Sequence, residues 1–294
     1  MSKKLDPLMF IVMASFWALN YPLVKIALAY ETPTVLLFFR VLFASGFSLI
    51  LFWNRIELRI SRRTALKVLV LSLFNVVLFM ELWFYSENFM SAPLTSVIIY
   101  TYPIISTALS ISLLQEKVRS STIIGIVLGF TGMIIVFSYH LGVDSFYGPF
   151  LALLGALSWS VGTVFFKRFI TFENKETVNL YQFVFALPIT LIIALLSGEV
   201  NEITNPSLLS LALAALIGIP GTAFAYYVFL HLNRDYSVAR ISSLLFVVPA
   251  VSVFFSFLIL NQLLNLVEIA GLVLISIGTF FSSGMINKRL RSVV

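Results

Sequence analysis

The sequence predicts an all-α membrane protein of ten transmembrane helices, built as two inverted five-helix repeats with both termini cytoplasmic. Three observations support this: the composition, ten apolar segments of helical length, and a one-sided distribution of lysine and arginine. The chain has 294 residues, of which 60% are hydrophobic and only 11% are charged. Soluble domains carry about 25% charged residues, and a soluble fold of this size could not bury so much apolar side chain. We therefore expect lipid to solvate the chain.

Ten apolar segments of about 20 residues follow one another with short polar connections. A helix of that length crosses the roughly 30 Å hydrocarbon core of a bilayer. The ten-residue alternating strands of a β-barrel are not seen. The expected spans are 7–29, 34–53, 65–85, 92–114, 120–139, 146–167, 177–197, 207–230, 238–260 and 266–286. Kinks are expected at the prolines inside them, which are Pro22, Pro103, Pro188, Pro220 and Pro249.

Lysine and arginine lie almost entirely on one side of these spans. Of the 19 basic residues, 17 fall near the termini or in every second connection. The connections on the other side, around Glu31, Glu87, Asp144, Glu199 and Glu268, contain none. Because cytoplasmic loops carry the excess of basic residues, we expect both termini in the cytoplasm and a multi-pass protein of the cell (plasma) membrane. The 17 residues are Lys3, Lys4, Arg55, Arg59, Arg62, Arg63, Lys67, Lys117, Arg119, Lys167, Arg168, Lys175, Arg234, Arg240, Lys288, Arg289 and Arg291.

The two halves of the chain resemble each other. Adding 142 to the residue number maps ASFWALNYPLVK (14–25) onto ALSWSVGTVFFK (156–167). After the seventh span four residues are gained, and adding 146 then maps Pro103 onto Pro249. The order of matching positions is kept along the whole chain, which indicates an internal duplication.

This duplication predicts two domains, residues 1–141 and residues 142–294. Each contains five spans, and an odd number of spans turns the second repeat upside down in the membrane. Inverted repeats suit alternating access, because one fold in two orientations can exchange conformations around a central site. A duplication without a transport role is the alternative.

Three segments carry a resemblance to a known family: FWALNYPLVK (16–25), LFFRVLFA (37–44) and the proline- and glycine-containing stretch 92–137. In these the chain resembles the EamA type of the drug/metabolite transporter superfamily, over nearly its whole length. The second copy departs from the first in having Gln262 where the first has Glu116. The resemblance implies a basket of helices, with helices one to four of each half around a central cavity and helices five and ten at the periphery.

Three charged residues, Lys25, Arg40 and Glu81, lie within the expected spans. Each ionised group near the bilayer centre costs roughly 2.5–3.5 kcal/mol on insertion scales, so all three are expected to face the bundle interior, water or one another. A functional interpretation is a charged lining that attracts the carboxylate or phosphate of a substrate, with Glu81 as counter-ion or proton carrier. The structural alternatives are a salt bridge and a lysine that extends to the membrane surface.

Aromatic and polar side chains are the other candidates for a solute site. Trp17 and Trp159 occupy equivalent places in the two repeats, and Tyr100 shares a helix face with Pro103. A cavity with aromatic walls and a few polar groups suits an amphipathic small molecule, whereas ordinary packing is the alternative for each aromatic residue. With the three charged residues, the predicted substrate-binding set comprises Trp17, Asn20, Tyr21, Tyr85, Tyr100, Trp159, Gln182 and Tyr227.

Glycines recur at helical spacing in the fifth span, at Gly125, Gly129 and Gly132, and in the tenth span at Gly271 and Gly278. Small residues on one face let helices approach closely in lipid, where the hydrophobic effect does not drive association. We therefore expect these glycines to pack helices.

The sequence favours a secondary transporter that moves a small metabolite outward by alternating access. The solute would be an amino acid or a similar amphipathic carboxylate, and a proton or an exchanged solute could drive it. No enzyme activity, cofactor, metal or nucleic-acid partner is expected, because the sequence has no glycine-rich phosphate loop, no nucleophile-base set and no cysteine. A membrane enzyme acting on lipids and a receptor without transport are the alternatives. The oligomeric state is open.

Overall fold

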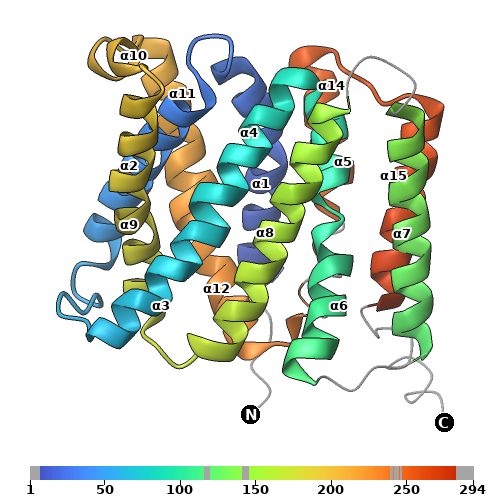
Figure 1. Cartoon of the computed structure of the whole chain (residues 1–294), viewed down its shortest axis with the longest axis horizontal. Helices are drawn as coiled ribbons and strands as arrows, with labels where there is room; N and C mark the ends of the chain where they lie inside the picture. Colours follow the sequence, from blue (N-terminus) through green and yellow to red (C-terminus); the bar gives the residue numbers. More distant parts are fainter. Residues whose placement is uncertain are drawn as a thin grey trace.

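A computed structural model describes residues 7–115, 120–140, 146–238, 241, 245 and 247–282, and its described elements are all helices (Figure 1). Seven helical segments among these residues are long and apolar enough to cross a membrane, and three shorter helices are also apolar. The chain is therefore an all-helical, multi-pass membrane protein. The seven long segments are Leu8–Ala27, Pro33–Phe52, Arg62–Phe89, Ala92–Leu114, Tyr147–Phe169, Lys175–Leu196 and Leu208–Asp235, and the shorter ones are Ile123–Val136, Val247–Leu260 and Leu266–Gly278.

The helices run up and down the bundle in chain order (Figure 1). The first part contains α1 (Pro7–Ala27), α2 (Pro33–Phe52), α3 (Arg62–Ser72), the π-helix η1 (Leu73–Leu78), α4 (Phe79–Phe89), α5 (Ala92–Ile99), α6 (Tyr102–Leu114) and α7 (Ser120–His140). The second part contains α8 (Tyr147–Phe169), α9 (Lys175–Leu196), α10 (Val200–Thr204), α11 (Leu208–Gly218), the π-helix η2 (Ile219–Phe224), α12 (Ala225–Asp235), α14 (Val247–Leu260) and α15 (Leu266–Ser282).

Three of the long segments are interrupted near their middle. The break between α5 and α6 precedes Pro103, whose ring would clash with the carbonyl four residues earlier if the α-helix were continuous there. Pro220 lies in η2, whereas η1 has no proline. Pro22 and Pro188 lie inside α1 and α9, which continue through them. The π-helices matter for the site because their widened turns leave backbone carbonyls free for side-chain donors.

Some residues used in the sequence analysis lie outside the described part of the chain. These are Lys3, Lys4, Glu116, Lys117, Arg119, the expected domain boundary at 141 and 142, Asp144, Arg240, Lys288, Arg289 and Arg291. One placement within the described part is corrected: Glu87, expected in a connection, lies in the last turn of α4 and is completely buried.

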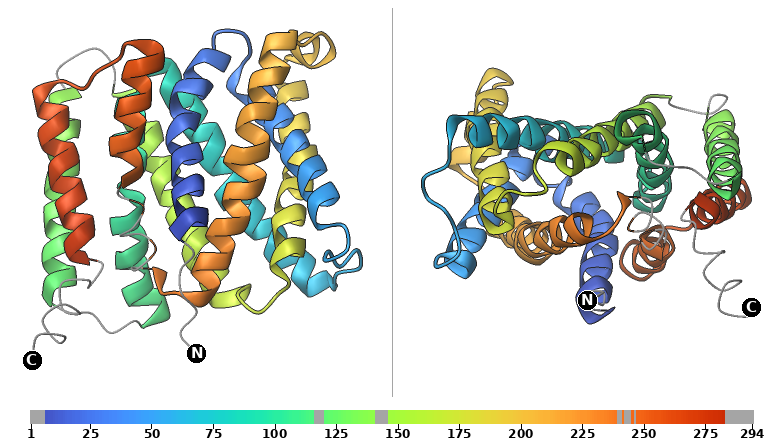
Figure 2. Two further views of the ribbon diagram at one scale, coloured as in Figure 1. Left: turned by 180° about the vertical axis from the view of Figure 1, so that it is seen from behind. Right: turned by 90° about the horizontal axis from the view of Figure 1, so that it is seen from below.

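The helices α7 and α15 form a pair at one edge of the bundle and contact the rest mainly through α6 (Figure 2). Glycine permits their close approach, as the sequence predicts. A Cβ added at Gly278 would lie 2.6 Å from the carbonyl oxygen of Gly125, and one added at Gly132 would lie 2.8 Å from that of Gly271. No side chain fits at these positions unless the two backbones separate.

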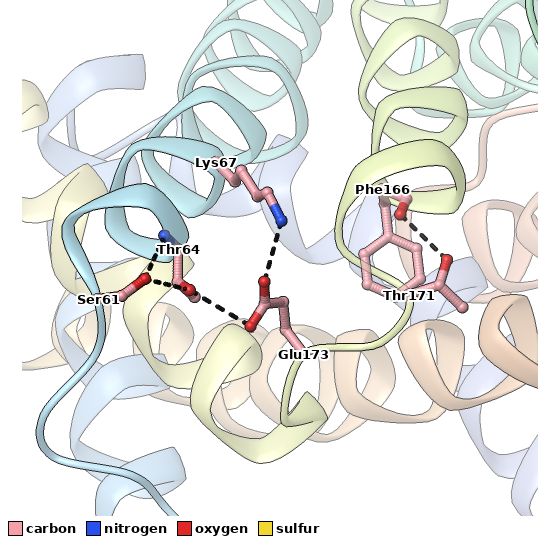
Figure 3. Close-up of polar contacts among 6 residues, drawn as sticks. All are labelled: Ser61, Thr64, Lys67, Phe166, Thr171 and Glu173. Atoms are coloured by element: carbon pink, nitrogen blue, oxygen red, sulfur yellow. Dashed lines mark hydrogen bonds and ion pairs between the residues drawn. The ribbon is translucent and has the colours of Figure 1, made fainter.

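At the end of the bundle where α3 begins, polar contacts join the first part of the chain to the α8–α9 connection (Figure 3). Lys67 on α3 forms an ion pair with Glu173 at 3.0 Å, and the Thr64 hydroxyl donates to the same carboxylate at 3.3 Å. Ser61 caps α3 by accepting from the Thr64 amide at 3.0 Å. Beside them, the Thr171 hydroxyl donates back to the last turn of α8.

We predict that Gly278→Ala destabilises the α7–α15 pair, because the new methyl group meets backbone that cannot move alone. Overpacking of this kind costs about 1–3 kcal/mol. The matched control is Gly46→Ala on α2, where a Cβ has no neighbour within 4 Å; alanine there favours the helix by up to about 1 kcal/mol. The melting temperature of the detergent-purified protein should fall in the first variant and hold or rise in the second. Equal melting temperatures for Gly278→Ala and the parent would contradict this packing.

Candidate functional site

A small cavity of about 30 Å³ lies between the helices near the two π-helical segments. Eleven residues line it, and none of them is more than 8% exposed. This space has room for only about two water molecules and is much smaller than a ligand pocket, so the lining residues would have to move apart to admit a metabolite. The lining residues are Trp17, Asn20, Tyr21, Arg40, Phe79, Trp83, Ile99, Tyr100, Tyr102, Trp159 and Tyr226.

Six aromatic rings form a closed circuit around the cavity, which we term the aromatic collar. Neighbouring ring centroids in this circuit are 4.6–6.4 Å apart, the range in which tilted and edge-to-face pairs attract each other. In order, the members are Trp83, Tyr21, Tyr100, Tyr102, Trp159 and Phe79. A collar of this kind offers a ligand flat apolar walls on all sides.

Arg40 supplies the positive charge of the cavity. It is 1% exposed, and its Nε donates to the hydroxyl of Thr222 in η2 at 2.6 Å. Its guanidinium carbon lies 5.2 Å from the Trp83 ring centre and 5.4 Å from that of Phe84, so aromatic faces partly replace its hydration. Its Nη1 has no hydrogen-bond partner.

Two further donors of the cavity lining are also buried without a partner. These are the indole Nε1 of Trp159 and the hydroxyl of Tyr102. A buried donor without an acceptor costs about 1–3 kcal/mol. The cavity is therefore arranged to receive hydrogen-bond acceptors from a ligand.

The two π-helices border the cavity, and side chains of the lining bind their free carbonyls. The Asn20 amide donates to the Gly221 carbonyl of η2 at 3.1 Å, and the Tyr226 hydroxyl donates to the Asn75 carbonyl of η1 at 2.9 Å. Glycine opposite each asparagine leaves room for the asparagine side chain. A Cβ at Gly221 would overlap the Asn20 side chain, and a Cβ at Gly162 would overlap that of Asn75.

Six residues of the predicted substrate-binding set line this cavity, and five do not. Those in the lining are Trp17, Asn20, Tyr21, Arg40, Tyr100 and Trp159, and those elsewhere are Lys25, Glu81, Tyr85, Gln182 and Tyr227. Among these described residues no ion pair joins Lys25, Arg40 and Glu81, so the structure does not contain the salt bridge that the sequence left as an alternative.

Lys25 extends away from the cavity to the end of α4. Its ammonium donates to the carbonyls of Glu87 and Met90, the latter at 3.0 Å. Lys167 does the same at the end of α12, donating to the carbonyls of Asn233 at 2.7 Å and Tyr236 at 2.9 Å. A lysine in this position satisfies the last carbonyls of a helix and complements its dipole.

The other four predicted residues that do not line the cavity make contacts elsewhere in the bundle. Glu81 accepts from the Thr34 hydroxyl at 3.2 Å, and Tyr85, partly exposed, lies 3.5 Å from the same hydroxyl. Tyr227 donates to Glu176 at 3.2 Å. Gln182 is buried, and its amide donates to Asn179 at 3.3 Å.

Five lining residues were missed by the sequence analysis: Phe79, Trp83, Ile99, Tyr102 and Tyr226. Trp83 could have been found through Glu87, because the two are one helical turn apart and a buried carboxylate requires a donor. The Trp83 indole donates to that carboxylate at 2.6 Å, while the second carboxylate oxygen has no partner.

Carboxylates also join the two parts of the chain at the end of the bundle opposite Lys67. The Ser210 hydroxyl on α11 donates to Glu31 in the α1–α2 connection, and the Thr32 amide donates to Glu202 at 2.8 Å. Burial raises the pKa of Glu31, the Ser210 hydroxyl opposes that shift, and the charge of Glu202 adds to it. Burial likewise raises the pKa of Glu199. These contacts hold the two parts of the chain together at this end of the bundle, and none of the residues involved lines the cavity.

Comparisons with known proteins match this chain to transporters. The EamA-like transporter family matches residues 6–138 and 146–284. "Uncharacterized transporter YvbV" of Bacillus subtilis is 30% identical over 269 residues, covering 88% of this chain and 85% of its own. "Probable amino-acid metabolite efflux pump" of Salmonella typhimurium is 24% identical over 295 residues, covering 96% of this chain and 95% of its own.

One solved crystal structure superposes with a TM-score of 0.68 at 17% identity, covering 96% of this chain and 98% of the other, which shows a shared fold. The family match spans almost the whole sequence in two segments, and the relatives are transporters and not enzymes. The chain therefore belongs to the EamA-like transporter family.

Proposed function

We propose that the protein is a secondary transporter that moves an amino acid or a similar amphipathic carboxylate outward across the cell membrane by alternating access. The observation that carries this proposal is Arg40, a buried cation with an unpartnered donor in the lining of a small aromatic cavity. The outward direction is supported by the relative named as an efflux pump. The driving force would be the gradient of the solute itself, a proton or an exchanged solute.

We further propose that residues 1–141 and 142–294 are two five-helix repeats of opposite orientation, which together give ten spans and cytoplasmic termini. Adding the three shorter apolar helices to the seven long segments gives ten. The start of α1 and the end of α15 lie at the same end of the bundle, which agrees with an even number of crossings (Figure 2). The family also matches the chain twice.

Contacts that recur with the shifts of 142 and 146 support the same arrangement. The π-helix η1 (Leu73–Leu78) becomes η2 (Ile219–Phe224) on adding 146. The pair Asn20 and Gly221 corresponds to Gly162 and Asn75, with the asparagine and glycine exchanged. The helix-end contacts of Lys25 correspond likewise to those of Lys167. In each contact one partner is shifted by 142 residues and the other by 146. The interacting pairs therefore correspond between the two halves, as well as the individual sequence positions.

The proposed cycle uses the contacts that cross between the repeats. Arg40 on α2 is bound to Thr222 in η2, and Tyr226 on α12 is bound to the Asn75 carbonyl in η1. A π-helical turn can tighten to an α-helical one by a local change in hydrogen bonding. Such a change at η1 or η2 would release one set of contacts and open the cavity toward one side of the membrane.

Topology can be tested directly, because the chain contains no cysteine. Single cysteines at Asn201 in α10 and at Arg59 in the α2–α3 connection lie at opposite ends of the bundle. A membrane-impermeant maleimide should label Asn201→Cys in intact cells and Arg59→Cys only after permeabilisation. Labelling of Arg59→Cys in intact cells would contradict the proposed orientation.

Transport should depend on Arg40. We predict that Arg40→Gln lowers solute flux in proteoliposomes by roughly tenfold or more, because a hydrogen bond to a charged group contributes about 1.5–3 kcal/mol. Arg40→Lys should retain part of the flux, since it keeps the charge without the planar donor group. Arg168→Gln, at the exposed end of α8, serves as the control. Full flux in both Arg40 variants would contradict the proposal that Arg40 binds the solute.

The role of Lys25 can be separated from that of Arg40. If Lys25 only binds the end of α4, Lys25→Met and Lys167→Met should lower the melting temperature by similar amounts. The KM for the solute, measured on the folded fraction, should then be unchanged in both. An increase in KM for Lys25→Met alone would show instead that this lysine contacts the solute.

A further inference from the structure

We infer that a groove at the end of α2 binds an anionic phospholipid, with the lipid phosphate at Arg55 and an acyl chain along the last turn of the helix. The groove lies between α2 and the segment formed by η2 and α12, and it shares no lining residue with the central cavity. Its volume is about 470 Å³, within the range of about 300–1,000 Å³ for ligand sites. The inference does not depend on the proposed transport function.

The lining changes from apolar to basic along the chain. Ile50 and Leu51, in the last turn of α2, are 79% and 51% exposed, so in a bilayer they face lipid. Trp53 follows directly after the helix and is 59% exposed, as is typical of aromatic residues at a membrane surface. Arg55 comes two residues later. The acyl chain and the charged headgroup of a phospholipid follow the same order from the bilayer interior to its surface.

Aromatic rings of η2 and α12 form the other wall of the groove. Phe224 is the last residue of η2, and Tyr227 lies in the first turn of α12. The Tyr227 ring packs against Phe52 of α2, with 4.5 Å between the ring centres. These rings give an acyl chain flat apolar surface to lie on. Thr222 of the same π-helix binds Arg40, so a lipid in the groove would contact the element that also borders the central cavity.

The charge of the groove is complementary to a phosphate. Arg55 is the one charged residue in the lining, and within the described part of the chain it forms no ion pair. Its guanidinium lies near the Tyr227 hydroxyl. A second cation, the Lys175 ammonium, lies 5.1 Å from the centre of the Tyr227 ring. Because a guanidinium presents parallel N–H donors that match phosphate oxygens, Arg55 is suited to hold the headgroup.

The surroundings of the groove are basic as well. Residues 53–63 contain four arginines and one glutamate. Glu176, the acidic residue that contacts the groove wall, accepts from the Tyr227 hydroxyl at 3.2 Å and is 8% exposed, so it is not part of the lining. In the proposed orientation this end of the bundle faces the cytoplasm. Anionic lipids are concentrated in the cytoplasmic leaflet, and basic pockets between transmembrane helices bind their headgroups.

The test compares dioleoylphosphatidylglycerol with dioleoylphosphatidylcholine, which have the same acyl chains and different headgroup charge. Each is added to the detergent-purified full-length protein, bound lipid is counted by native mass spectrometry, and the melting temperature is measured. We expect phosphatidylglycerol to bind saturably and to raise the melting temperature, because a ligand of the folded state stabilises it. Phosphatidylcholine should do neither at the same concentration. Equal binding of the two lipids would overturn the inference.

Two arginine variants test the headgroup contact. Arg55→Gln should weaken the binding of phosphatidylglycerol about fivefold, because a basic residue beside an anionic lipid surface contributes about 1 kcal/mol. The matched control is Arg59→Gln, which removes the same charge from the same connection at a residue outside the lining. If Arg55→Gln weakens binding no more than Arg59→Gln does, the groove is not the lipid site.

Competition separates a lipid from a water-soluble anion. Glycerol 3-phosphate carries the phosphate without acyl chains, so it lacks the contacts with α2 and with the aromatic wall. At the same concentration it should neither displace phosphatidylglycerol nor raise the melting temperature. Displacement of the lipid by glycerol 3-phosphate at equal concentration would assign the groove to soluble phosphates and refute the lipid site.

Discussion

Hydrocarbon offers no hydrogen-bond partner, so every backbone carbonyl freed inside the membrane has to be satisfied by the protein itself. The two π-helices create this need at the middle of the bundle, and side chains from other helices meet it. Carbonyls of η1 accept from Ser158 and Tyr226, and carbonyls of η2 accept from Asn20 and Asn179. Asn20 and Tyr226 also line the cavity. The side chains that satisfy the π-helical carbonyls therefore form part of the cavity wall.

Much of the fold could be predicted from the sequence because lipid imposes strong rules on length and charge. Every expected span contains a helix in the described residues, and the break before Pro103 was foreseen from the chemistry of proline. The π-helices could not be foreseen, since η1 contains no proline and its segment reads as an ordinary apolar helix. Glu87 was misplaced because a carboxylate near a span end resembles a loop residue when its buried partners are unknown.

The site was predicted less completely. Polar residues within apolar helices identified Asn20 and Arg40, and the repeat identified Trp17 and Trp159. Phe79 gave no signal, because a helix segment that is apolar all round has no periodicity to mark its inner face, and the signal for Trp83 depended on Glu87, which the sequence analysis placed in a connection. Lys25 shows the converse difficulty: its charge marks a buried position, but its ammonium is bound to the end of α4. Charge inside a membrane thus locates an interior residue without distinguishing a ligand-binding role from a helix cap.

The glycine contact between α7 and α15 has a mechanical consequence. One helix of this pair belongs to each proposed repeat, and their backbones touch too closely to slide without clashing. A relative rotation of the repeats would therefore pivot near this edge. On the far side of the bundle, α2 of the first proposed repeat packs against α9 and α11 of the second, so these contacts would have to rearrange as the repeats turn.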